Sequence, residues 1–174
     1  MQSDADQARR VRFDQVVAIY HPDMYRYAVW LSRNPVVAEE VVQEALLRAW
    51  KSLHALRDDG AAKSWLLTIV RRENARYFER KRLETVDIDD LTPAQSAMIA
   101  EEDVEQVRDV REAIYRLDDD YREPLVLQVL MGHSTKEIAE LMGLKQGAVL
   151  TRLHRARLKL RDVIMRQADS LPGN

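Results

Sequence analysis

The chain has 174 residues and a formal net charge of −2, with 46% hydrophobic and 32% charged residues. This length allows one domain or two small ones, and the scarcity of Gly and Pro, five of each, favours an all-α fold. The absence of Cys excludes disulfides, thiol chemistry and Cys-ligated zinc. The sequence has no apolar signal core, and no stretch approaches the roughly 20 apolar residues that span a bilayer. We therefore expect a cytoplasmic protein that does not insert into a membrane.

Two amphipathic helices are predicted at the start of the chain. Residues 1–10 are polar and are expected to fray, whereas apolar residues recur at helical spacing over 13–31. Pro22 lies inside that pattern and predicts a kink or a break. Asn34 is a good N-cap, and Pro suits the first turn, so the second helix is predicted over Pro35–Leu53.

A third helix is predicted from about residue 62 to 82, after a polar loop over 54–61. The aromatic and aliphatic side chains expected to face inward are Trp65, Leu66, Ile69, Val70, Tyr77 and Phe78. The remaining positions are basic, with only Glu73 and Glu79 as acids. Three such helices can close one small core, so residues 1–83 are interpreted as a domain.

The composition then changes, because the stretch from Glu84 to Glu105 holds eight acids and no Lys or Arg. We interpret 84–100 as a flexible acidic linker and 101–174 as a second domain. In that domain the Asp run 118–120 offers an N-cap, with Glu123 as third residue of a helix that Gly132 ends. The positions expected to face its core are Val104, Val107, Val110, Ile114, Leu117, Leu125, Val126, Val129 and Leu130.

The stretch from 134 to 163 predicts a helix-turn-helix. Ser134 and Glu137 can form a capping box, Gly143 can end the first helix, and residues 144–146 can form the turn. The apolar stripe of the second helix is Val149, Leu153, Ala156, Leu160 and Val163. Its outer face carries Thr151, Arg152, His154, Arg155, Arg157, Lys159 and Arg161. This pattern favours DNA binding over the alternative, a helical hairpin with a solvated charged face.

Motifs for catalysis or metal binding are absent from the sequence. It has no Gly-rich phosphate loop and no HExxH, and its four His are scattered. Nothing pairs a nucleophile with a base. We therefore expect neither an enzyme nor a bound metal or cofactor.

Three segments resemble the extracytoplasmic-function (ECF) sigma factors of bacterial RNA polymerase. They are AEEVVQEALLRAWKSL (38–53), KSWLLTIVRRENARYFERKR (63–82) and LDDDYREPLVLQVLMGHSTKEIAELMGLKQGAVLTRLHRARLKLR (117–161). The resemblance implies a promoter-specificity subunit. Its first domain would bind the beta-prime clamp helices of the polymerase core and read the −10 element as single strand. Its second domain would bind the beta flap and read the −35 element as duplex.

The resemblance also implies residue roles. Core-polymerase binding would fall to Glu40, Gln43, Glu44 and Arg48. Contacts to the −10 element would fall to Arg71, Arg72, Arg76, Arg80 and Lys81. The loop Leu56–Ala62 would capture a flipped base. Contacts to the −35 element would fall to Lys145, Gln146, Thr151, Arg152, Arg155 and Arg157.

The sequence departs from the family pattern at several of these positions. Arg72 and Arg76 stand where Asn and Asp are usual, Ala148 replaces a usual Thr, and Leu150 and Leu158 replace usual basic residues. The apolar side chain of Leu150 could contact either a thymine methyl or a protein partner, and the sequence leaves both alternatives open.

An anti-sigma factor is a further implied partner, with a membrane-anchored form as one option. Its candidate contacts are Val42, Leu46 and Leu47, and core packing is the alternative for each of the three. Two other readings of the residues stay open. One is a DNA-binding repressor or activator that dimerises on a two-fold operator. The other is a helical interaction module without a nucleic-acid role.

Overall fold

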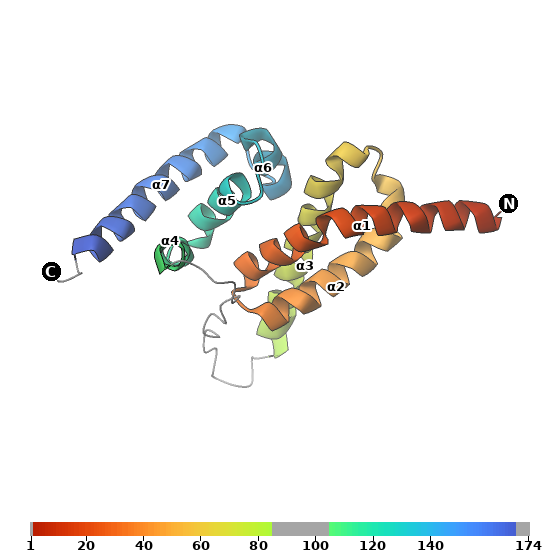
Figure 1. The fold of residues 1–174 in the computed structure, drawn as a ribbon, viewed down its shortest axis with the longest axis horizontal. Coiled ribbons are helices and arrows are strands. Elements are labelled where there is room, and N and C mark those ends of the chain that lie inside the picture. Colours follow the sequence, from red (N-terminus) through yellow and green to blue (C-terminus); the bar gives the residue numbers. More distant parts are fainter. Residues whose placement is uncertain (1, 85–104, 170–174) are drawn as a thin grey trace. The chain divides into compact units, whose positions relative to one another are not determined.

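The computed structural model describes residues 2–84 and 105–169, and all the regular structure in these ranges is helical, which confirms the all-α prediction (Figure 1). The chain divides into two compact units. The helices of the first unit are α1 (Gln2–Ser32), α2 (Pro35–Lys51) and α3 (Ala62–Glu84), with 3-10 turns η1 (Leu53–Ala55) and η2 (Asp59–Ala61). Those of the second unit are α4 (Glu105–Tyr115), α5 (Asp119–Val129), α6 (Thr135–Met142) and α7 (Gln146–Asp169).

The predicted acidic linker lies almost wholly outside the described residues. Only its first residue, Glu84, is described, and it ends α3. The domain limits at 83 and 101 therefore stay predictions. None of the described helices is long and apolar enough to cross a membrane.

Helix α1 is longer than the sequence pattern predicted. The prediction of fraying over residues 1–10 was wrong from Gln2 onward, and Pro22 lies inside an unbroken helix, so the predicted break is also wrong. A proline in a helix removes one backbone hydrogen bond. Just beyond it Met24 and Tyr27 are fully buried, and this packing holds the chain in helical register across the proline.

The core of the first unit lies where α1, α2 and α3 meet. The start of α2 is as predicted, because the Asn34 side chain accepts hydrogen bonds from the backbone amides of Val36 and Val37. Its buried stripe includes three small residues, Ala38, Ala45 and Ala49. Small side chains let neighbouring helices approach closely, which suits a core built from only three helices.

Helix α3 matches its prediction along the first half only. Of its predicted core positions, Leu66, Ile69 and Val70 are buried, and Trp65 and Tyr77 are half-buried. Phe78 was predicted to face inward and is 45% exposed, so that prediction was wrong. The last buried residue of α3 is Glu73, and the side chains that follow it in the helix are half-buried or exposed.

The second unit is a small bundle in which α7 packs against α4, α5 and α6. Its core is built by Ala113, Ile114, Leu117, Leu125, Val126, Leu127, Ile138, Leu141, Val149, Leu153 and Ala156. Three predicted core positions were wrong, because Val110, Val129 and Leu130 are exposed. At the end of α5 the chain turns, and Met131 and His133 take buried positions instead.

Helix α5 also begins earlier than predicted, since the prediction made Glu123 its third residue. It starts at Asp119, which makes Glu123 the fifth residue, and the Asp118 side chain forms no capping hydrogen bond. Gly132 lies beyond the helix and adopts φ +72°, a conformation that favours glycine. Pro124 is the sixth residue of α5, so it removes the amide that would bond to the Asp120 backbone oxygen, and its burial in the core offsets that loss.

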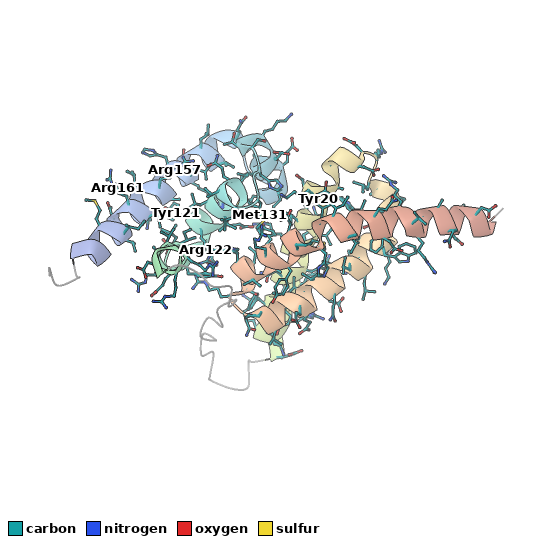
Figure 2. All side chains as sticks on the ribbon, viewed as in Figure 1. Tyr20, Tyr121, Arg122, Met131, Arg157 and Arg161 are labelled. Carbon is teal, nitrogen blue, oxygen red and sulfur yellow. The ribbon has the colours of Figure 1, made fainter. Side chains whose placement is uncertain are left out.

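A buried arginine joins α4 to α5. Arg122 donates hydrogen bonds to the backbone oxygens of Tyr115 (3.2 Å) and Leu117 (3.0 Å), and it forms an ion pair with Asp119. Figure 2 labels Arg122 between the two helices. The guanidinium thus satisfies carbonyls at the end of α4 that no helical amide reaches.

We therefore expect Arg122→Ala to lower the free energy of unfolding of the second unit by about 2–4 kcal/mol, because two backbone acceptors and the Asp119 carboxylate lose a charged donor. Native-state hydrogen exchange of amides in α5 would measure the change. The matched control is Arg116→Ala, which removes an exposed pair with Glu112 and should leave the exchange unchanged. Equal effects of both variants would contradict this role.

Candidate nucleic-acid interface

The predicted helix-turn-helix is confirmed in detail. The Ser134 hydroxyl accepts a hydrogen bond from the amide of Glu137, and the Glu137 carboxylate accepts one from the amide of Ser134 at 2.8 Å, which completes the capping box. Gly143 adopts φ +66° and ends α6. Helix α7 begins at Gln146, so the turn is one residue shorter than predicted.

Helix α7 has a buried side and an exposed basic side. Val149, Leu153 and Ala156 are buried, as predicted. Arg155 lies on the opposite side, and neither it nor Lys145 forms an ion pair with another described residue. Cations without an internal counter-charge can neutralise phosphate without first breaking a contact within the chain.

Other predicted −35 residues of α7 have partners in α5. Arg152 is only 28% exposed and lies 3.0 Å from the carboxylate of Asp120. Arg157 donates to the side-chain oxygen of Gln128. Figure 2 shows Arg157 on α7 beside the helix that carries Tyr121. These two arginines would have to exchange partners to bind DNA, whereas Arg155 would not.

The two remaining residues of the predicted −35 set lie near the start of α7 and are exposed. Gln146 donates to the hydroxyl of Thr135 at 2.9 Å and so joins α7 to α6. The Thr151 hydroxyl donates to the backbone oxygen of Gly147 at 3.0 Å. Leu150 precedes Thr151 and is 53% exposed, so it is accessible to either of its two proposed contacts, a thymine methyl or a protein partner.

The basic helix of the first unit is α3, with seven Lys or Arg against three Glu. Arg72 and Arg80 are exposed and form no ion pair with any other described residue. Arg71 is half-buried. The Lys81 ammonium lies 3.5 Å from the Glu84 carboxylate.

Glu73 gathers two of the predicted site residues around one carboxylate. It is only 7% exposed, and it lies 2.7 Å from Arg76 of α3 and 3.3 Å from Arg48 of α2. A buried carboxylate needs such partners to remain charged. Arg48 and Arg76 therefore contribute to the packing of α2 on α3, a role that the sequence did not reveal.

An aromatic pair that is partly exposed was also missed. The rings of Tyr77 and Phe78 meet edge to face with centroids 5.4 Å apart, and the Lys81 ammonium lies 6.0 Å from the Tyr77 ring. Aromatic faces beside cations suit unpaired bases, which stack on them. The sequence contained no clear signal for it, because adjacent helical residues such as Ile69 and Val70 can both be buried, and the exposure of Phe78 depends on what packs against this end of α3.

The predicted polymerase-binding residues of α2 are brought together on one face. Glu40, Gln43 and Glu44 are exposed, and so is Arg48. Of the candidate anti-sigma contacts, Leu47 is exposed and Leu46 is half-buried, whereas Val42 is buried in the core. Of the two alternatives left open for Val42, the structure therefore shows core packing.

These two helical units match two family models. Residues 16–84 match Sigma-70 region 2, and residues 108–160 match Sigma-70, region 4. The architecture is thus that of a sigma-70-type initiation factor, with a region 2 bundle and a region 4 helix-turn-helix in the expected order.

Curated relatives and solved structures place the chain more narrowly. It is 31% identical over 157 residues to the ECF RNA polymerase sigma factor EcfG of Rhodopseudomonas palustris, covering 86% of this chain and 82% of that protein. It is 32% identical over 162 residues to SigL of Mycobacterium tuberculosis, covering 87% and 86%. The sigma factor RpoE from Bartonella quintana, solved in complex with the anti-sigma factor NepR, superposes with a TM-score of 0.79 at 26% identity, covering 88% of this chain and 97% of that one.

The chain belongs to the ECF sigma factors. It is therefore a promoter-specificity subunit that binds RNA polymerase core and directs transcription initiation at −10 and −35 elements. The resemblance found in the sequence is confirmed.

Arg72 and Arg76, which lie on either side of Glu73 in the sequence of α3, are expected to differ in what they contribute. Arg76→Ala should lower the free energy of unfolding of the first unit by about 1 kcal/mol, because Glu73 keeps only the partly exposed Arg48 as partner. Arg72→Ala should leave stability unchanged and weaken binding to single-stranded DNA. Urea unfolding, monitored by hydrogen exchange of the α3 amides, would measure the stability of both variants. Binding to single-stranded DNA as a function of salt concentration would measure their affinity. The assignment fails if Arg72→Ala is the destabilising variant.

Proposed function

We propose that the two basic helices divide promoter recognition between them. Residues 1–83 form the unit that binds polymerase core and the −10 element, 84–100 link the two units, and 101–174 bind the −35 element. The observation that supports this division most directly is that each unit carries cations with no ion-pair partner among the described residues, Arg72 in the first and Arg155 in the second.

The second unit reads the −35 element through α7. The major groove admits a helix, and the first turns of a recognition helix reach the base edges. Arg155 and Thr151 contact bases or phosphates from the exposed side of α7. Lys145 and Gln146 lie at its start, where backbone amides also attract phosphate. Arg152 and Arg157 then exchange Asp120 and Gln128 for DNA.

The first unit receives the −10 element along α3. Arg71, Arg72, Arg76, Arg80 and Lys81 supply the positive charge for the separated strand. Tyr77 and Phe78 supply a stacking surface, and base–aromatic stacking contributes about 1–3 kcal/mol per base. The loop Leu56–Ala62 captures a base that has left the stack. Flipping is least costly where the strands are already open.

The polymerase core is held by both units. The acid and amide face of α2, with Glu40, Gln43 and Glu44, suits a basic partner surface, and the beta-prime clamp helices are the expected one. Arg48 adds a donor at the edge of this face while it retains Glu73. The beta flap is the expected partner of the second unit.

An anti-sigma factor is the proposed regulator. RpoE of Bartonella quintana is solved with the anti-sigma factor NepR, and CnrH, 27% identical to this chain with a TM-score of 0.64, is solved with the cytosolic domain of CnrY. On this chain the exposed Leu47, beside the polymerase-binding face of α2, is a contact that such an inhibitor would cover. A membrane-anchored inhibitor stays a prediction, as does the cytoplasmic location.

Run-off transcription with purified core polymerase tests this function. Initiation at a matched promoter should require the chain. Arg155→Ala should reduce initiation about tenfold, since one base-reading arginine contributes about 1–3 kcal/mol. The matched control is Arg161→Ala, another exposed arginine of α7, which lies four turns from the start of the helix and next to Asp162. Tight binding to a palindromic duplex without polymerase would instead favour a repressor.

Leu150 offers a separate test of how α7 reads the duplex. If its exposed side chain contacts a thymine methyl, replacing that one −35 thymine by deoxyuridine should weaken holoenzyme binding about threefold, since burying one methyl contributes about 0.8 kcal/mol. Leu150→Ala should abolish the difference between thymine and deoxyuridine. Competition binding with single deoxyuridine replacements measures both. Equal binding at every position would assign Leu150 to a protein partner.

A further inference from the structure

The N-terminal half of α1 lies outside the segment that matches region 2, which starts at residue 16. It nevertheless contacts the loop between α2 and α3. Arg12 donates two hydrogen bonds to one carboxylate oxygen of Asp59, from Nε at 3.1 Å and from Nη2 at 2.6 Å. Nη2 also donates to the backbone oxygen of Leu56 at 2.9 Å. One guanidinium thus joins two points of the loop.

The loop has few other restraints on its outer part. Leu53 and Leu56 are buried and anchor its first half in the core. Residues 57–61 are all exposed. Within them, the Asp58 side chain accepts a hydrogen bond from the amide of Gly60 at 2.9 Å, which is a local turn contact. Arg12 is therefore the long-range contact that ties this exposed tip to a helix.

The position of Arg12 is itself fixed by the preceding turn of α1. Arg9 donates to the backbone oxygen of Trp50 at 2.7 Å, and its guanidinium lies 4.7 Å from the Trp50 ring. The Phe13 ring meets the same Trp50 ring edge to face, with centroids 5.2 Å apart. Arg9, Arg12 and Phe13 share one face of α1, and this face packs on the end of α2.

We propose that Arg12 is a positioning residue for −10 recognition, which holds the loop Leu56–Ala62 in the conformation that receives the flipped base. The inference rests on the proposed role of that loop. A binding loop that becomes ordered only when the ligand binds has a lower affinity, because part of the binding free energy offsets the entropy lost on ordering. Arg12 removes that cost in advance. It also neutralises Asp59, whose carboxylate would otherwise repel DNA phosphates.

The test compares Arg12→Ala with Arg10→Ala in reconstituted holoenzyme. Arg10 is an exposed arginine of the same helix whose side chain forms no hydrogen bond or ion pair with another described residue, so the control removes the same charge without the loop contacts. The measurement is competition binding of single-stranded −10 oligonucleotides in which each base is replaced in turn. Duplexes with −35 replacements, core-polymerase affinity and the melting temperature are measured alongside.

Arg12→Ala should reduce discrimination at one −10 base about three- to tenfold, as expected for loss of charge-assisted hydrogen bonds at a partly exposed site. Discrimination at −35, core affinity and melting temperature should not change. Arg12→Lys keeps the charge and loses the two-pronged guanidinium, so its −10 discrimination should lie between those of Arg12→Ala and the unmodified chain. Arg10→Ala should match the unmodified chain.

Two results would overturn the inference. One is unchanged −10 discrimination in Arg12→Ala when the unmodified chain does discriminate. The other is an equal loss at −10 and −35, which would indicate general destabilisation. If the unmodified holoenzyme shows no base preference at −10, the proposed role of the loop fails, and the positioning role fails with it.

Discussion

The constraint on which the molecule depends is the separation of its positive charge from its own acids. The chain has 29 Asp and Glu against 27 Lys and Arg, so cations left near carboxylates would be neutralised within the fold. Several arginines are in fact used this way. Arg122 is buried against carbonyls, and Arg152 lies beside Asp120. Arg72 and Arg155 are held away from acids on exposed helical faces, and these are the charges that a polyanion can reach.

The cores serve this separation by fixing which side of each helix is exposed. Buried small residues of α2 allow α1 and α3 to pack closely, and the stripe from Val149 to Ala156 turns the basic side of α7 outward. The capped turn between α6 and α7 then sets where the basic helix begins. Each unit presents its charge through packing that the sequence pattern specifies.

The parts of the fold that could be predicted from the sequence are those with local causes. Ser134, Glu137 and Gly143 lie within ten residues of one another, so capping and turn chemistry alone place the helix-turn-helix. The errors arose where distant contacts decide. Fraying near the N-terminus was predicted from the polar composition of residues 1–10, which could not reveal that Arg9 contacts Trp50, 41 residues away in sequence. Periodicity likewise located the basic faces, but it could not show that Asp120 partners Arg152 or that Glu73 joins two helices.

The shared carboxylate of Glu73 has an evolutionary consequence. Loss of Glu73 leaves two arginines facing each other across a helix contact, and loss of either arginine leaves a sequestered negative charge with weaker support. Single changes at any of the three positions therefore lower the stability of the first unit, while a joint replacement by apolar side chains would cost binding and not stability. Sequences descended from this one should keep the trio intact or exchange all its members together.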